Sequence, residues 1–280
     1  MRLPDWIKTH NHADLHETKH LLRRHALSTV CEEARCPNRS ECFSRPTATF
    51  MILGTNCTRN CGFCSVSYSS PVPVDKHEPE NIALAAEEMG LRYVVVTSVT
   101  RDDLPDGGAG HFAKTIISLR KRIPDIKIEV LTPDFMGDTD ALRKVLDAGP
   151  DVFNHNIETV KRLYPAVRPD ADYERSLKIL KQAKDFVADI YIKSGFMLGL
   201  GEKYEEIMDL LEDLRKVGCD FVTIGQYLRP TRNNLPVVEY IEPDVFVDLK
   251  QKALDMGFKY AASGPLVRSS MNAEEMYEHV

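Results

Sequence analysis

The chain has 280 residues, 43% of them apolar and 28% charged, which is the composition of an ordinary soluble globular protein. Its formal net charge of −6 argues against a generally basic surface, so we expect no nucleic-acid partner. No stretch approaches the ~20 apolar residues of a membrane span, and the first residues lack the apolar run of a secretory signal. We therefore expect a cytoplasmic chain without a membrane partner, in which cysteines serve metal or redox chemistry.

Short β-branched apolar runs alternate with longer amphipathic stretches along the middle of the chain. The predicted strands are Thr49–Leu53, Tyr93–Ser98, Ile126–Leu131, Val152–Asn156, Ile190–Met197 and Phe221–Ile224. The predicted helices are His111–Lys121, Thr139–Asp147, Glu158–Tyr164, Tyr173–Lys184 and Tyr204–Val217. This alternation predicts an α/β fold with parallel strands joined by right-handed crossovers. About six strand–helix units are fewer than the eight of a closed barrel, so we expect a partial, open parallel β/α barrel.

The two ends of the chain lie outside this alternation. We predict an N-terminal extension over residues 1–48, the barrel over 49–230 and a C-terminal extension over 231–280, all in one compact unit. The carboxyl ends of the strands carry many polar side chains, and in such folds the chemistry gathers at that end. Ordinary loop polarity is the alternative explanation for about half of them.

The loop after the first predicted strand contains Cys57, Cys61 and Cys64, separated by three and then two residues. Gly62 gives the backbone the freedom to curl these thiolates around one centre. Three ligands leave one iron of a four-iron cluster without a protein ligand and open to a substrate. A structural zinc is the alternative, but it normally recruits a fourth Cys or His at a matching spacing. Phe63 inside the loop either shields a cluster or belongs to the core.

A second trio, Cys31, Cys36 and Cys42, has intervals of four and five residues. On one continuous helix Cys36 would point about 140° away from Cys31, and Pro37 biases Cys36 away from helical angles. The segment is therefore predicted to bend, which suits three thiolates that converge on one cluster. Three unrelated buried cysteines are the alternative. The seventh cysteine, Cys219, is interpreted as a core thiol.

The first trio, directly after a strand, resembles the radical S-adenosylmethionine (SAM) superfamily. The two trios together with Arg268-Ser269-Ser270 resemble the lipoyl synthase family within it, over nearly the whole chain. Further similar segments are Pro4-Asp-Trp6, Thr97–Leu104, Asp106-Gly-Gly-Ala109, Phe153–Thr159, Gly199-Leu-Gly-Glu202 and Gly225-Gln-Tyr-Leu228. Met271 departs from the pattern, because the family usually has an aromatic residue there.

The resemblance implies a sulfurtransferase that inserts two sulfur atoms at C6 and C8 of an octanoyl chain amide-linked to a lysine of a lipoyl-carrier domain. It implies two 4Fe-4S clusters and SAM as cofactors, with the auxiliary cluster as the sulfur source. Unactivated C–H bonds have no useful acidity, so no side chain is expected to act as the catalyst. The implied partners are the octanoylated carrier, a low-potential electron donor and an iron–sulfur carrier that rebuilds the auxiliary cluster. We expect a monomer.

The same resemblance implies which residues bind the cofactors. Cys57, Cys61 and Cys64 would hold the SAM cluster, and Cys31, Cys36, Cys42 and Ser269 the auxiliary cluster. Capping of a helix that starts near Asn272 is the alternative role for Ser269. The residues expected to bind SAM are Thr97, Ser98, Arg101, Glu129, Asn154 and Lys193. The alternative for Arg101 is a salt bridge with Asp102 or Asp103.

Two other functions remain open on the sequence alone. One is a different radical SAM sulfur-inserting enzyme, similar to biotin synthase, in which a second cluster also donates sulfur. The other is a non-enzymatic module with two structural zinc sites.

Overall fold

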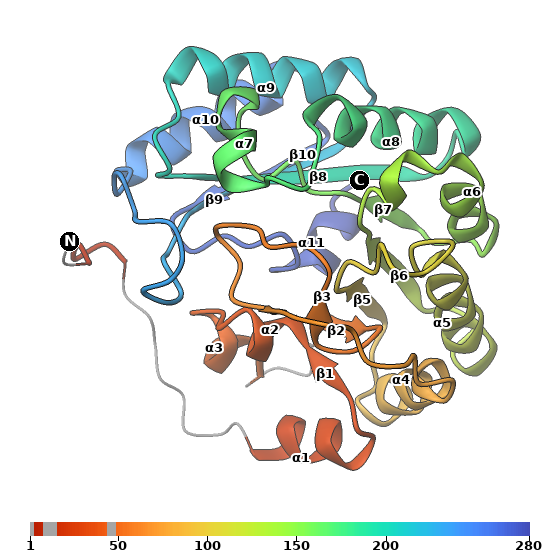
Figure 1. Ribbon diagram of the computed structural model, residues 1–280. Coiled ribbons are helices and arrows are strands. Elements are labelled where there is room, and N and C mark those ends of the chain that lie inside the picture. Colours follow the sequence, from red (N-terminus) through yellow and green to blue (C-terminus); the bar gives the residue numbers. More distant parts are fainter. Residues whose placement is uncertain (1–2, 8–15, 44–48) are drawn as a thin grey trace. The chain divides into compact units, whose positions relative to one another are not determined.

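The computed structural model describes residues 3–7, 16–43 and 49–280 (Figure 1). Parts of the predicted N-terminal extension, residues 1–2, 8–15 and 44–48, lie outside the described residues. The chain divides into two compact units. We call Thr9–Arg59 with Val66–Phe153 the N-terminal unit, and Met1–Lys8, Asn60–Ser65 and Asn154–Val280 the C-terminal unit. The predicted domain boundaries at residues 48 and 230 stay predictions.

The N-terminal unit contains a mostly parallel sheet flanked by helices. Its elements in chain order are α1 (His16–Arg24), β1 (Ser28–Thr29), α2 (Val30–Glu33), α3 (Arg39–Phe43), β2 (Thr49–Ile52), β3 (Asn56–Cys57), β4 (Ser67–Tyr68), α4 (Glu78–Glu88), β5 (Tyr93–Ser98), α5 (Ala109–Arg122), β6 (Lys127–Leu131), the 3-10 helix η1 (Phe135–Gly137), α6 (Thr139–Asp147) and β7 (Val152–Asn154). The strands follow the order β1-β2-β5-β6-β7. Strand β1 is antiparallel to β2, whereas β2, β5 and β6 are parallel.

Helices α4, α5 and α6 follow one another along this sheet (Figure 1). Their apolar faces are buried together with strand side chains such as Val94, Val96, Ile128 and Val130. Strands buried on both faces are typical of parallel sheets covered by helices. Helix α6 starts where the Asp138 carboxylate accepts hydrogen bonds from the backbone N–H groups of Asp140 and Ala141.

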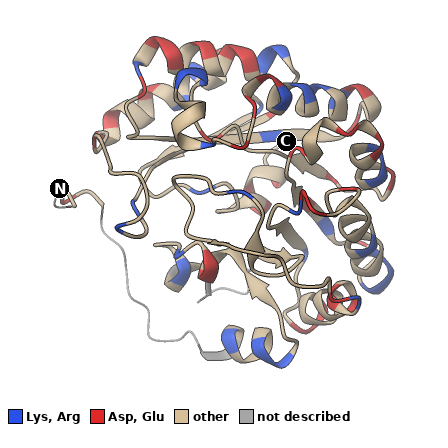
Figure 2. Cartoon of the chain, viewed as in Figure 1, with Lys and Arg blue, Asp and Glu red and all other residues tan. Residues whose placement is uncertain are grey.

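The C-terminal unit contains a second run of parallel strands. Its elements are η2 (Lys161–Leu163), α7 (Tyr164–Val167), α8 (Tyr173–Phe186), β8 (Tyr191–Leu198), α9 (Tyr204–Lys216), β9 (Phe221–Gln226), α10 (Pro243–Asp255), β10 (Tyr260–Gly264) and α11 (Ala273–Glu278). Strand β9 lies between β8 and β10 and is parallel to both. The outer helices α8 and α9 carry many Lys, Arg, Asp and Glu residues (Figure 2), as is ordinary for a solvated helix face.

The predicted strands and most predicted helices are confirmed, with ends shifted by a few residues at most. The α/β class with a mostly parallel sheet is likewise confirmed. The helix predicted over Glu158–Tyr164 is wrong at its start. Glu158 has a left-handed backbone (φ 68°) and forms a bridge with Phe196, so the helical segment begins only at η2.

Both terminal extensions contribute more to the sheet than expected. In the N-terminal unit β1 pairs with β2, and in the C-terminal unit β10 pairs with β9 along its whole length. The β10 sequence, Tyr-Ala-Ala-Ser-Gly, contains no β-branched residue, so its composition gives no strand signal. Helix α4, whose apolar residues are mainly alanines, was also absent from the prediction.

Candidate functional site

Cys57 lies at the end of the short strand β3, in the N-terminal unit. Strand β3 pairs in parallel with β4. The Cys57 Sγ accepts hydrogen bonds from the backbone N–H groups of Arg59 (3.5 Å) and Thr100 (3.3 Å). Two N–H donors directed at one sulfur suit a thiolate, because they stabilise its negative charge.

Cys61 and Cys64 lie in the C-terminal unit, on a tightly held turn. The Cys64 N–H donates to the Cys61 carbonyl oxygen (3.1 Å), and the Gly62 N–H donates to the Val167 oxygen (2.9 Å). The Asn234 side-chain amide donates to the Cys64 carbonyl oxygen (2.7 Å). A Cβ at Gly62 would lie 2.8 Å from Leu235 Cδ1, so any larger residue would force Leu235 or the turn to shift.

Phe63, the other residue of this turn, packs in the core. It contacts the cluster formed by Val167, Leu200 and Tyr227. Of the two roles predicted for Phe63, the described contacts favour the core residue. Its packing fixes the turn that carries Cys61 and Cys64.

The second trio lies on a bent segment of the N-terminal unit, as predicted. Cys31 is in α2, Cys42 is in α3, and Cys36 lies between them, after Arg35 with its left-handed backbone (φ 51°). Burial, followed by repulsion from the thiolates of Cys36 and Cys42, raises the pKa of Cys31 to about 12. A cationic iron centre bound to these thiolates would relieve that repulsion.

The donor sets of both trios fit iron–sulfur clusters. None of the six cysteines forms a disulfide in the described chain, and five of them are partly exposed. Among the described residues, no three Cys, His, Asp or Glu side chains are gathered closely enough to hold a single metal ion. The thiolates of a four-iron cluster each bind a different iron, so they are spaced more widely than the ligands of one ion.

Four predicted SAM-binding residues lie in the N-terminal unit, and only Ser98 has an unused polar atom. Its hydroxyl is buried and has no hydrogen-bond partner in the described chain. Thr97 donates to the Leu131 oxygen, and Glu129 accepts from the Tyr93 hydroxyl. Arg101 forms a salt bridge with Asp103 and donates to the Leu53 oxygen, so the predicted alternative for Arg101 is the observed arrangement. The other two candidates, Asn154 and Lys193, are fully buried in the C-terminal unit.

Ser269 lies in the turn between β10 and α11 and is partly exposed. The residue before α11 is Asn272, with a left-handed backbone (φ 51°), and no side chain caps this helix end. The capping role considered for Ser269 is therefore not observed. Arg268 donates to the Val267 carbonyl oxygen (2.6 Å), which ties its side chain to the same turn.

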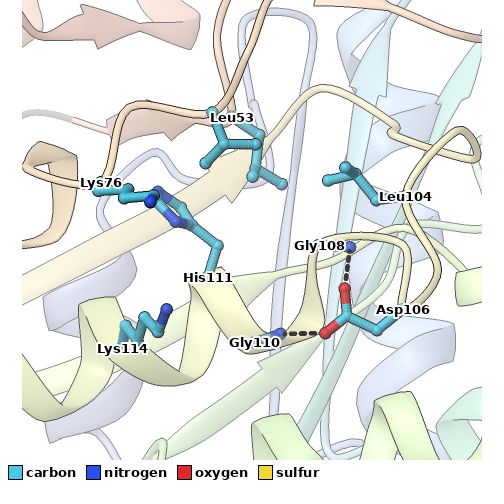
Figure 3. A pocket seen from close by; sticks show the side chains of 9 residues that line it. Leu53, Lys76, Leu104, Asp106, Gly108, Gly110, His111 and Lys114 are labelled. Carbon is cyan, nitrogen blue, oxygen red and sulfur yellow. Dashed lines mark hydrogen bonds between the residues drawn. The ribbon is translucent and has the colours of Figure 1, made fainter.

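Asp106 and Gly108 help to line a pocket of about 280 Å³ in the N-terminal unit (Figure 3). The Asp106 carboxylate accepts hydrogen bonds from the Gly108 and Gly110 N–H groups, so it already satisfies the start of α5. His111 faces the pocket and contacts Glu78, 2.7 Å away. The glycines are needed for packing, since a Cβ at Gly108 would lie 2.3 Å from Leu53 Cδ1.

Several other polar residues at strand ends stabilise the backbone. Glu202 accepts from the Gly199 and Leu200 N–H groups, and the Gln226 amide bridges the Leu198 and Glu239 oxygens. His155 contacts the Ser176 hydroxyl (3.1 Å). Cys219 is fully buried, as predicted for a core thiol.

Sequence reasoning missed three residues that hold the cysteine loops. Arg59 lies within the cysteine motif, but the motif assigns it no role. Nothing in the sequence pattern indicated its partner Asp134 or the side-chain amide of Asn234. Each acts through a contact with a residue at least 75 positions away.

Residues 51–225 match the profile of the radical SAM superfamily. The chain is 57% identical over 274 residues to lipoyl synthase of Caldicellulosiruptor saccharolyticus, covering 97% of this chain and 96% of the relative. It is 54% identical to lipoyl synthase of Caldanaerobacter subterraneus over 275 residues, covering 98% and 96%. Among solved structures, methylornithine synthase has a TM-score of 0.55 at 15% identity, covering 91% of this chain and 84% of that one. SuiB of Streptococcus suis has a TM-score of 0.59 at 15% identity, covering 76% and 48%.

The solved structures support the fold, and the matched profile defines the class: the chain belongs to the radical SAM superfamily. Membership of this class implies a 4Fe-4S cluster and SAM. The near full-length relatives define the family more narrowly. The chain belongs to the lipoyl synthase family and is a radical SAM sulfurtransferase. In the described residues, no helix combines the length and apolar character needed to span a membrane.

Proposed function

We propose that this chain inserts two sulfur atoms, at C6 and C8, into an octanoyl group amide-linked to a lysine of a lipoyl-carrier domain. The lipoyl synthases of more than 50% identity over nearly the whole chain support this activity. One observation on the structure carries it furthest. A second trio of thiols, Cys31, Cys36 and Cys42, lies on the bent segment that runs from α2 to α3, in addition to the trio of the superfamily.

Each trio has a separate role in this proposal. Cys57, Cys61 and Cys64 hold a 4Fe-4S cluster with one open iron for SAM. Cys31, Cys36 and Cys42 hold an auxiliary 4Fe-4S cluster, with Ser269 as its fourth ligand. When bound, the clusters and SAM supply the radical and the sulfur that unactivated C–H bonds require.

The side chains of this chain bind and orient rather than transfer protons. Ser98 supports the SAM site best, because its buried hydroxyl lacks a partner in the described chain. Thr97, Arg101, Glu129, Asn154 and Lys193 complete the proposed set. Arg101 could bind SAM only if it gave up its salt bridge with Asp103, so we propose that it contributes least to SAM binding.

The proposal extends to partners. These are an octanoylated lipoyl-carrier protein, a low-potential electron donor and an iron–sulfur carrier that rebuilds the consumed auxiliary cluster. The protein acts as a cytoplasmic monomer.

The test is an anaerobic assay with SAM, a low-potential reductant and an octanoylated carrier peptide, with iron and sulfide measured beforehand. We expect about eight irons per chain, the sum of two four-iron clusters, and a doubly thiolated peptide. Replacing Cys31, Cys36 and Cys42 by Ala should halve the iron and abolish thiolation, while 5′-deoxyadenosine still forms. Replacing Cys57, Cys61 and Cys64 should abolish both products.

Two results would remove the assignment. Formation of 5′-deoxyadenosine with no thiolated peptide from the fully loaded protein would keep the superfamily chemistry and reject the substrate. Bound zinc in place of iron would reject both. A Ser269→Ala protein that makes normal product from an intact auxiliary cluster would refute the serine ligand, with Ser270→Ala as the matched control.

A further inference from the structure

Arg59 lies between the first two cysteines of the loop, and its guanidinium is buried between two carboxylates of the N-terminal unit. Its Nε donates to Asp102 Oδ2 (2.7 Å) and its Nη2 to Asp102 Oδ1 (2.9 Å). The same Nη2 donates to Asp134 Oδ1 at 2.6 Å. Only 5% of Arg59 is exposed, and Asp134 is completely buried. A two-pronged contact of this kind fixes the position and the orientation of the guanidinium.

These contacts bear directly on the surroundings of Cys57. The two N–H donors to its sulfur belong to Arg59 itself and to Thr100, two residues before Asp102. Thr58 links the same two segments, since its N–H and hydroxyl both donate to the Thr100 carbonyl oxygen (3.0 Å each). The Asp102 N–H donates back to the Thr58 hydroxyl (3.1 Å). The ion pair and the Thr58 hydrogen bonds therefore hold together the two backbone segments whose N–H groups donate to the Cys57 sulfur.

We propose that Arg59 is a positioning residue for Cys57, and that its contacts with Asp102 and Asp134 set the reduction potential of the cluster in the loop. This inference rests on the proposed function, in which Cys57 is a cluster ligand. Reduction adds one negative charge to the cluster, and N–H groups directed at a ligating sulfur stabilise that charge. Loss of these hydrogen bonds makes the cluster harder to reduce, which lowers its potential.

The test is a potentiometric titration of the loop cluster, followed by electron paramagnetic resonance. It is carried out on the full chain, and again with Cys31, Cys36 and Cys42 replaced by Ala, so that only the loop cluster contributes. Arg59→Lys keeps the charge but not the planar fork. We expect its potential to fall by at least the equivalent of a tenfold change in the equilibrium, ~59 mV for one electron. Arg122→Gln is the control, because Arg122 also bonds two carboxylates (Glu80 and Glu87) but lies exposed on α5.

The variant Asp102→Asn distinguishes the effect of Arg59 positioning on the cluster potential from the effect of the Asp102 charge. Removal of a negative charge near the cluster raises its potential, whereas a looser Arg59 and weaker N–H···S bonds lower it. We expect a lower potential than in the parent protein. A higher potential in Asp102→Asn, or a parent-like potential in Arg59→Lys, would overturn the proposal. If Arg59→Lys fails to retain iron, Asp102→Asn decides, since the Asp102 side chain is partly exposed and its loss disturbs less.

Iron and sulfide analysis distinguishes a failure of the proposed function from a failure of the positioning role of Arg59. A parent protein without a cluster in the loop contradicts the proposed function. Loaded variants with unchanged potentials contradict the role of Arg59 alone.

Discussion

Close packing restricts which side chains individual positions of the cysteine loops can accommodate. Gly62 is the clearest example, because its neighbours leave no room for a side chain. A Cβ there would lie 2.8 Å from Leu235 Cδ1 and 3.1 Å from the Ala166 carbonyl oxygen. A side chain can rotate away, but a backbone oxygen moves only with its segment. The turn that carries Cys61 and Cys64 therefore depends on the absence of a single methyl group.

Gly62→Ala should lower both the iron content and the thermal stability, because either Leu235 or the turn must shift. Overpacking of this kind typically costs ~1–3 kcal/mol. The measurements are iron per chain and the melting temperature of the anaerobically purified protein. Gly264→Ala is the control, since a Cβ there meets its nearest neighbour at an ordinary 3.5 Å. Equal iron contents in the two variants would contradict this account of the turn.

Cys219 should remain unmodified when the cluster cysteines react. Burial raises the pKa of Cys219 and so keeps it as a thiol, while only thiolates react with iodoacetamide. After cluster removal, iodoacetamide should alkylate the five partly exposed cysteines and leave Cys219 unlabelled in the folded protein. Peptide mass spectrometry gives the labelled positions. Labelling of Cys219 at the rate of Cys61 would show that it is accessible.

At the level of elements, the cysteine turn is held by loops together with the end of helix α7, whose Val167 oxygen accepts from the Gly62 N–H. The Leu235 N–H donates to the Gly62 oxygen (2.9 Å), and the Asn234 amide donates to the Cys64 oxygen. The Asn60 N–H donates to Asp170 Oδ2 at 3.1 Å. Loops are positioned in this way when backbone groups that lack a sheet or helix partner find partners elsewhere. The loop over residues 229–235 therefore stabilises the cysteine turn.

Asn234→Ala should accelerate cluster loss, because the Cys64 carbonyl oxygen loses its donor. Removal of one such hydrogen bond costs ~1 kcal/mol, about a fivefold change in an equilibrium constant. The decay of visible absorbance in the presence of an iron chelator measures this rate. Asn233→Ala, at the exposed neighbouring position, should behave like the parent protein. Identical decay in the two variants would mean that the amide does not hold the turn.

On the scale of the whole molecule, the C-terminal extension is part of the sheet of its unit. Strand β10 pairs with β9 from Tyr260 to Gly264, and α10 packs against β10. Phe246, Leu249 and Ala253 on α10 are fully buried. Burial of a large apolar side chain contributes ~1.5–3 kcal/mol, so this element stabilises the fold as well as carrying Ser269.

Phe246→Ala should therefore destabilise the main unfolding transition. Phe-to-Ala changes in a core cost ~3–5 kcal/mol, whereas exposed substitutions stay within ~0.5 kcal/mol. Val247→Ala is the matched control, because Val247 is 66% exposed on the same helix. Urea unfolding followed by circular dichroism measures both. A parent-like transition for Phe246→Ala would mean that the extension is a separate appendage.

The alternation of strands and helices and the two cysteine trios could be predicted from the sequence. Apolar periodicity reports burial directly, so the strands Tyr93–Ser98 and Phe221–Gln226 and the helix Thr139–Asp147 were predictable. Thiolate spacing within a short segment is also local information. It indicated both trios and the bend at Cys36.

The residues that support those cysteines could be identified only from their contacts in the folded chain. Arg59 meets Asp134, and Asn234 meets Cys64, across 75 and 170 residues. Polar contacts between residues so far apart in the sequence depend on how the loops fold, and they produce no periodic pattern in the sequence. Strand β10 shows the same limit, because its small residues form a strand through pairing with β9 rather than through intrinsic preference.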